Sequence, residues 1–133
     1  MATTTAAVTL TSDLLSDNIS VNASTTCMKA GTTADGLDQI EYGYVEIASG
    51  TAYDIIGNTP TASKASKLYV KNHSTDETYY ISVVLDAQAI GRLYAGDWAF
   101  FPWNADTGTT PDADIKIDPS ANDMTLEYML FSE

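Results

Sequence analysis

Along much of the chain, apolar residues alternate with polar residues at every second position. This period is produced by β-strands that bury one face. Turn-forming Gly, Asn, Asp and Pro residues separate the runs at spacings of about eight to twelve residues, which is typical of all-β domains. No segment sustains a helical period over several turns. The pattern predicts an all-β chain with strands near residues 19–21, 42–44, 68–70, 79–85, 115–117 and 124–130.

The N-terminal segment differs from the rest of the chain. Residues 1–12 are rich in Thr and Ala and carry no charged side chain, so we expect an extended N-terminal arm, with disorder as the alternative. Residues 12–17 contain a possible short helical turn with Ser12 as its cap. Residues 13–133 contain no linker and no repeat. We expect them to form a single domain, a β-sandwich or jelly roll.

Two segments, residues 66–86 and 88–103, provide most of the evidence for this fold. Residues 66–86 contain a strand pattern, a polar turn and a second strand pattern, which predicts a β-hairpin. Its turn into the next strand, at residues 86–88, has Ala where Gly would adopt a positive φ more easily. In residues 88–103, Gly91 interrupts a strand and predicts a bulge or a close backbone approach, and a tight turn at residues 95–97 precedes an aromatic strand.

The apolar positions of these strands predict the core, and Tyr79 is expected on the same strand face as three of its members. Because side chains alternate along a strand, a register error of one residue would exchange buried and exposed faces. The expected core consists of Ile81, Val83, Leu85, Ile90, Leu93, Phe100, Ile115, Ile117, Leu126 and Tyr128.

The amino-acid composition argues against two classes of binding partner, nucleic acids and anionic membranes. The 133 residues carry a net charge of −12, with 18 acidic and only six basic side chains. A nucleic-acid-binding protein needs a basic surface, and an anionic membrane attracts basic segments, so we expect neither partner. No signal peptide and no apolar stretch of membrane-spanning length is visible, and we expect a chain made in a cytoplasm.

The sequence contains no strong candidate for a catalytic or metal-binding site. The chain has one His and one Cys, which excludes a His/Cys metal cluster and a disulfide within one chain. His73 lies in a polar turn and there is no nucleophile elbow, so we expect neither an enzyme nor a cofactor. The segment Asp112–Asp123 resembles an EF-hand loop but has Ile117 where Gly is required. A calcium site between loops stays open as an alternative.

Apolar side chains on both faces of single strands suggest a protein partner. In residues 98–103, Trp98 and Phe100 alternate with Phe101 and Trp103, so both strand faces need an apolar neighbour. Stacking of the two Trp side chains on sugar rings is the alternative. The residues that we expect opposite the core, in contact with other subunits, are Tyr69, Lys71, Trp103, Met129 and Phe131.

Three short segments carry a resemblance to a known class of protein. They are K-N-H-S at residues 71–74, G-R-L-Y-A-G-D at residues 91–97 and F-P-W at residues 101–103. Together with residues 113–133, they resemble small virion structural proteins of tailed bacteriophages, in which a K-N-x-S hairpin, a G-x-L-x-x-G-D turn and an aromatic strand follow one another.

The resemblance implies a non-enzymatic subunit of the virion, a capsid decoration (cement) protein of β-sandwich or jelly-roll type. A neck, tail or fibre-base subunit is the alternative, and a carbohydrate-binding module is a third reading. The implied partners are the major capsid protein and sister copies, with a homotrimer favoured. The negative charge suits the exterior of a shell better than contact with packaged DNA.

The sequence predicts the effect of two changes on assembly. Trp103→Ala should weaken assembly by about 2 kcal/mol or more while the isolated subunit keeps its fold, because interfaces concentrate their energy in aromatic anchors. Deletion of residues 1–12 should reduce binding to the particle more than it lowers the melting temperature. If both proteins bind to shells as well as the unaltered protein does, the interface lies elsewhere.

Overall fold

Ten β-strands and no helix make up the part of the chain that the structure, a computed structural model, describes: residues 3–14, 19–50, 52–54, 64–85, 87–102, 115–121 and 123–133. The expectation of an all-β domain is confirmed. The strands are β1 (Thr4–Ser12), β2 (Ile19–Cys27), β3 (Gln39–Ile47), β4 (Tyr53–Asp54), β5 (Lys67–Asn72), β6 (Tyr80–Leu85), β7 (Gln88–Tyr94), β8 (Trp98–Pro102), β9 (Ile115–Pro119) and β10 (Met124–Ser132).

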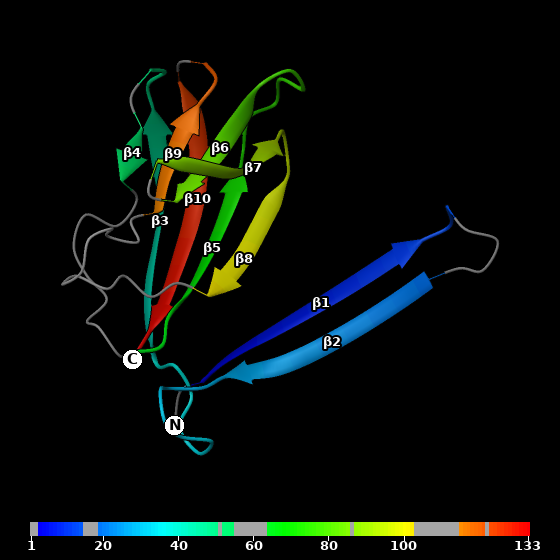
Figure 1. The fold of residues 1–133 in the computed structure, drawn as a ribbon, viewed down its shortest axis with the longest axis vertical. Coiled ribbons are helices and arrows are strands. Elements are labelled where there is room, and N and C mark those ends of the chain that lie inside the picture. Colours follow the sequence, from blue (N-terminus) through cyan, green and yellow to red (C-terminus); the bar gives the residue numbers. More distant parts are fainter. Residues whose placement is uncertain are drawn as a thin grey trace.

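Strands β3 to β10 pair in a nested order (Figure 1). β6 pairs with β7, β5 with β8, β4 with β9 and β3 with β10, and every pair is antiparallel. This is the pairing of one long hairpin that has been rolled up. Rolling produces two four-stranded sheets, with the orders β3-β10-β5-β8 and β4-β9-β6-β7. Two sheets of four strands in this connectivity are a jelly roll, one form of the β-sandwich.

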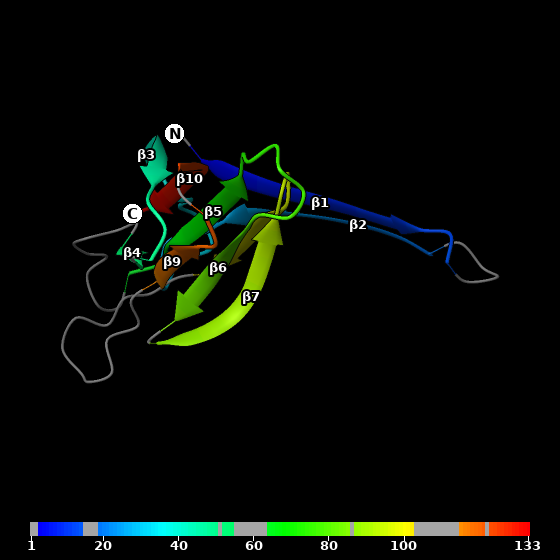
Figure 2. The same ribbon diagram turned by 90° about the horizontal axis from the view of Figure 1, so that it is seen from above.

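The core lies between the two sheets, which face each other in Figure 2. Six of the expected core residues are buried there, and Tyr128 packs against them. They are Ile81, Val83, Leu93, Ile115, Ile117 and Leu126. The core also contains apolar residues that the sequence did not single out: Ile47, Leu68, Val70, Met124 and Leu130.

The predicted β-hairpin over residues 66–86 is wrong. β5 belongs to one sheet and β6 to the other, so residues 73–79 cross from layer to layer and do not close a hairpin. β5 is a central strand, paired with β10 and β8, and β6 is paired with β7 and β9. A polar turn between two strands looks the same in sequence whether the strands pair or pack face to face.

Three residues expected in the core are not buried. Leu85 ends β6 and is 37% exposed, and Ile90 is 60% exposed. Phe100 is half-buried on the opposite face of β8, because Ala99 and Phe101 are the β8 residues that pack against the core. The alternation along β8 was correct, but the faces were exchanged.

Ile90 lies three residues before the buried Leu93, so the alternation of side chains along β7 turns it away from the core, and it lies at a bulge. Val83 lies opposite Gly91 and Val84 lies opposite Ala89, so Ile90 has no partner and the alternation shifts by one residue. The expected irregularity at Gly91 is therefore confirmed. In the turn before β7, Ala87 has a φ of 64°, a left-handed conformation that few residues other than Gly adopt.

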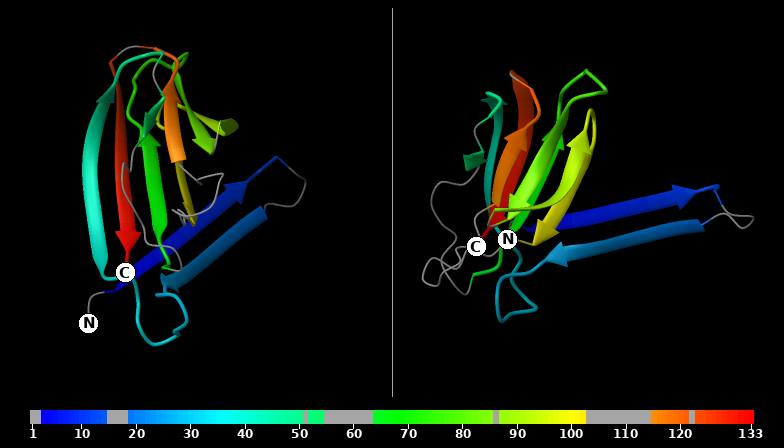
Figure 3. Two further views of the ribbon diagram at one scale, coloured as in Figure 1. Left: turned by 60° about the vertical axis from the view of Figure 1, so that its left-hand side comes forward. Right: turned by 45° about the horizontal axis from the view of Figure 1, so that its top comes forward.

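The N-terminal segment pairs with the segment that follows it. Thr4–Ser12 forms β1, and its residues lie opposite β2 from Cys27 back to Ile19 in an unbroken antiparallel register. Ser12 thus ends a strand, where the sequence suggested a helix cap, and residues 15–17 of the expected helical turn lie outside the described residues. In Figures 1 and 3 this hairpin of β1 and β2 projects past β8, away from the jelly roll.

Asn72, which is fully buried at the end of β5, connects the two sheets. Its Nδ2 donates a hydrogen bond to the Leu93 carbonyl (3.0 Å), and its Oδ1 accepts one from the Ser74 backbone N–H (2.8 Å). Its backbone N–H donates to the Asp97 carbonyl, and its carbonyl accepts from the Gly96 N–H. The K-N-H-S and G-x-L-x-x-G-D segments therefore meet in space, and their role here is structural.

Asn72→Ala should lower the free energy of unfolding by about 2–3 kcal/mol, because the Leu93 carbonyl and the Ser74 N–H lose their buried partner. Thr75→Ala, an exposed change three residues away, serves as the control and should stay within about 0.5 kcal/mol. Urea titration followed by tryptophan fluorescence measures both. Equal stability of the two variants would show that Asn72 does not connect the sheets.

Candidate protein interaction surface

One face of the β3-β10-β5-β8 sheet points away from the core and is rich in apolar side chains. We call it the outer face. Alternate residues of the same strands, such as Leu68, Val70 and Leu126, are buried in the core, which assigns the remaining positions to the outer face. The register aligns these positions in three rows across the four strands: Ile40–Phe131–Lys67–Pro102, Tyr42–Met129–Tyr69–Phe100 and Tyr44–Glu127–Lys71–Trp98.

Four of the five residues expected at an interface lie together on this face. Tyr69 and Lys71 come from β5, and Met129 and Phe131 come from β10, the strand beside it. All four are half-buried. Trp103 lies outside the described residues. The structure thus groups these side chains on one surface, and their contact with other subunits stays a prediction.

Other outer-face residues were not singled out for this surface. Ile40, Tyr42 and Tyr44 of β3 are all at least half exposed, at 62%, 50% and 56%. β3 turns Val45 and Ile47 toward the core instead. Gly43 permits this arrangement.

Gly43 lies opposite Tyr128, and a Cβ atom at Gly43 would come within 3.1 Å of the Tyr128 ring. The ring fills the space that a side chain would need. The short distance explains why β3 has no side chain at this inward position, and only the strand pairing reveals it.

Aromatic rings of the outer face contact one another. The ring centroids of Tyr42 and Tyr44 are 5.5 Å apart, and those of Phe100 and Phe131 are 6.3 Å apart, both edge to face. Tyr69 packs beside Trp98 at 6.2 Å. These distances are within the range in which aromatic pairs stabilise each other. The outer face therefore holds its rings in a fixed arrangement, which reduces the entropy lost on binding a partner.

A small polar group lies at the end of this surface. The His73 Nε2 and the Glu127 Oε2 are 2.6 Å apart, and the Tyr44 ring packs against the His73 ring at 5.5 Å. A hydrogen bond with Tyr44 raises the pKa of the Tyr42 hydroxyl to about 12, with further contributions from desolvation and from the negative charge of Glu127. Tyr42 therefore stays neutral in the physiological range.

The projecting hairpin has two distinct faces. Cross-strand pairs place Thr and Ser or Asn side chains together on one face, as in Thr9 with Asn22 and Thr11 with Ser20. The other face carries every Val, Leu and Ile side chain of β1 and β2, with Thr25 and Ser12 as polar members beyond its first pair. It consists of Thr4 with Cys27, Ala6 with Thr25, Val8 with Ala23, Leu10 with Val21 and Ser12 with Ile19.

The first half of the hairpin lies over the outer face. Together they line a groove with a volume of about 350 Å³. Within β1, the side chains of Thr4, Ala6 and Val8 are partly buried, whereas Leu10 is 59% exposed. The groove is lined by residues 4–8 of β1 and by Tyr69, Trp98, Phe100, Met129 and Phe131.

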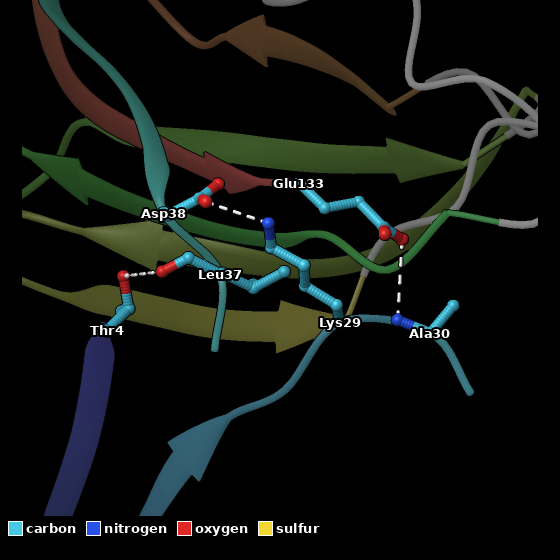
Figure 4. A network of polar contacts seen from close by, with 6 residues as sticks. All are labelled: Thr4, Lys29, Ala30, Leu37, Asp38 and Glu133. Atoms are coloured by element: carbon cyan, nitrogen blue, oxygen red, sulfur yellow. Dashed lines mark hydrogen bonds and ion pairs between the residues drawn. The ribbon is translucent and has the colours of Figure 1, made fainter. Parts of the chain in front are cut away.

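Polar contacts attach the base of the hairpin to the jelly roll (Figure 4). The Thr4 hydroxyl donates to the Leu37 carbonyl (3.3 Å), and the Leu37 N–H donates to the Cys27 carbonyl (2.8 Å). The Lys29 ammonium and the Asp38 carboxylate form an ion pair at 2.7 Å, which raises the pKa of Lys29 and lowers that of Asp38. Leu37 and Cys27 are both buried at this junction.

The C-terminal residue contributes to the same junction. One Glu133 carboxylate oxygen accepts hydrogen bonds from the backbone N–H of Ala30 (3.4 Å) and of Ala65 (2.6 Å). Ala30 follows the hairpin, and Ala65 precedes β5. The contact therefore connects the base of the hairpin to the end of the outer-face sheet, and it helps to set the direction in which the hairpin projects.

The structure offers a binding surface, and the described residues contain no group of three or more His, Cys, Asp or Glu side chains that could hold a metal ion. Of the calcium candidates, Asp112 and Asp114 lie outside those residues. No described helix is long and apolar enough to cross a membrane. No family model, curated protein or solved structure matches the chain.

Substitutions of Phe100 and Phe101 test which face of β8 packs against the core and which face takes part in assembly. Phe101→Ala should cost about 3 kcal/mol of folding stability, because Phe101 packs against the core. Phe100→Ala should cost less than half as much in the isolated subunit but should weaken assembly, because Phe100 lines the outer groove. Thermal unfolding and sedimentation velocity measure the two effects. The reverse order of stability would show that β8 has the opposite register.

Proposed function

We propose that the protein is a non-enzymatic structural subunit of a tailed-bacteriophage virion, a decoration protein that binds to the assembled head and stabilises it. Its partners are the major capsid protein and sister copies. The proposal combines the resemblance of residues 68–103 and 113–133 to such proteins with the properties of the outer face and the hairpin. It locates the mature protein in the virion.

One observation carries the proposal: the β3-β10-β5-β8 sheet carries large apolar side chains on both faces. The inner face packs against the second sheet, and the outer face presents aromatic and aliphatic side chains in cross-strand rows. A monomer in water gains nothing from such a face. A subunit that is buried between other proteins gains about 25 cal/mol for each Å² of apolar surface that is removed from water.

Charge supports a position on the exterior of the head. The net charge of −12 repels packaged DNA. The hairpin residues 3–12 and 19–28, in contrast, carry no charged side chain. They form a surface that another acidic protein can approach without strong repulsion.

A decoration protein stabilises a shell by mass action. It binds the assembled shell and not the dissociated subunits, which adds about 2.7 kcal/mol per site when the free protein is at 100 times its dissociation constant. Repeated over the many equivalent sites of a head, this contribution resists heat and internal pressure. No catalytic group is needed for this function.

A carbohydrate-binding module is the second candidate, because the groove beside Trp98 is open and aromatic. Aromatic rings can stack on the apolar faces of sugars. Half of the groove wall, however, is the protein's own β1, which leaves less of the aromatic surface open to a sugar.

The copy number in purified particles tests the proposal. We expect hundreds of copies per particle, measured by quantitative mass spectrometry against the major capsid protein. Purified protein added to shells that lack it should also raise their melting temperature. A copy number of about a dozen or fewer would assign the protein to the neck or tail, and a monomeric protein that binds glycans but not shells would replace the proposal.

A further inference from the structure

Among the described residues, two surfaces expose large apolar side chains, and they lie near opposite edges of the β3-β10-β5-β8 sheet. The first is the distal half of the hairpin, where Leu10, Ile19 and Val21 are each about half exposed. The second is the outer face of β3, which carries Ile40, Tyr42 and Tyr44. β3 and β8 are the two edges of their sheet, and the hairpin projects past β8 (Figure 1).

We propose that the distal half of the hairpin of one copy binds the outer face of β3 of a second copy, so that subunits assemble head to tail. The inference rests on the proposed function, because it names the partner that the hairpin of the subunit binds. The occupant is a sister copy and not the capsid protein, for three reasons.

The first reason is continuity with the contact inside one subunit. The same hairpin face that carries Leu10 also carries Ala6 and Val8, which lie against the outer face of their own sheet. If a second copy places its β3 beside β8, the hairpin continues from one outer face onto the next. The beginning of the hairpin already lies with its apolar face toward the part of the outer face formed by β10, β5 and β8.

The second reason is the length of the distal half of the hairpin. Residues 9–12 and 19–22 extend the hairpin by about 14 Å beyond the groove, at about 3.4 Å per residue. That length spans two to three strands at the usual spacing of about 4.8 Å. The distal half is therefore long enough to cover the outer face of β3 but too short to cover a second complete sheet.

The third reason is charge and direction. The distal half of the hairpin carries no charged side chain, and Ile40, Tyr42 and Tyr44 are uncharged, although Glu127 and Glu46 lie at the far end of the β3 face. In a chain of net charge −12, a contact of the uncharged hairpin with Ile40 and Tyr42 limits the repulsion between two copies. The four strands alternate in direction, so β3 and β8 run in opposite directions. A second copy in the same orientation thus presents its β3 antiparallel to β8. Repetition of such a contact closes a ring when the rotation between copies permits it.

The proposal also explains how the hairpin is stabilised. A two-stranded hairpin alone is marginally stable in water, and one that packs against another element is more stable. Within one subunit only its first half has such support. A second copy supplies the support for the remainder, and the hairpin in return covers β3 of that copy.

Sedimentation velocity over a range of concentrations tests the proposal with two disruptive variants of the full chain. Leu10→Asp places a charge on the apolar face of the hairpin, and Ile40→Asp places one on the outer face of β3. Each should weaken self-association about tenfold or more. Thr9→Asp is the matched control, because it adds the same charge one residue away on the polar face of the hairpin, and it should associate like the unaltered protein.

Mixing the two variants distinguishes head-to-tail contact from other arrangements. A Leu10→Asp subunit keeps an intact β3 face, and an Ile40→Asp subunit keeps an intact hairpin. An equimolar mixture should therefore form heterodimers but nothing larger. A mixture that stays monomeric overturns the proposal, as does association of either variant at the strength of the unaltered protein, or equal loss in the Thr9→Asp control. Circular dichroism confirms that each variant is folded.

The outcomes separate this inference from the proposed function. A protein that stays monomeric at every concentration but binds to shells at high copy number overturns the head-to-tail contact and leaves the decoration role standing. A protein that associates head to tail but is absent from particles keeps the contact and overturns the role in the virion.

Discussion

Burial of apolar surface on both sides of one sheet is the constraint on which the rest of the structure depends. β5 and β10 lie in the middle of the β3-β10-β5-β8 sheet, and each alternates core residues with apolar residues of the outer face. The second sheet can cover only one side. The other side needs a different cover, and part of it comes from the chain's own N-terminal hairpin.

The N-terminal hairpin covers only part of the outer face. In the proposed assembly, a second copy supplies the rest of the cover. The first five residues of β1 line the groove over Tyr69, Phe100 and Met129, whereas large apolar side chains of the distal half of the hairpin and of the outer face of β3 are exposed among the described residues. The junction around Leu37, Lys29 and Glu133 sets the direction in which the hairpin projects. In the proposed assembly, the geometry of that junction decides where a neighbouring subunit binds.

Prediction from the sequence succeeded where a local pattern is produced by only one kind of structure. Alternation with a period of two requires a strand, and a Gly within a strand marked the bulge in β7. Prediction failed where two structures share the same local pattern. The polar segment after Asn72 connects two sheets and not two paired strands, and Phe100 and Phe101 are equally apolar although only Phe101 packs against the core.

The sequence by itself determined that this chain is all-β, that its strands lie near the predicted positions, and that Tyr69 and Lys71 in one strand, and Met129 and Phe131 in another, point away from the core. Each of these properties depends on near neighbours in the chain. Only the tertiary structure decided which strands pair, which face of β3 and β8 turns inward, that residues 4–12 pair with residues 19–27, and that residues 4–8 lie over the outer face. The reason is that pairing in a jelly roll joins residues far apart in sequence, such as Met124 with Ile47, and the total apolar surface buried selects among pairings that look equivalent locally.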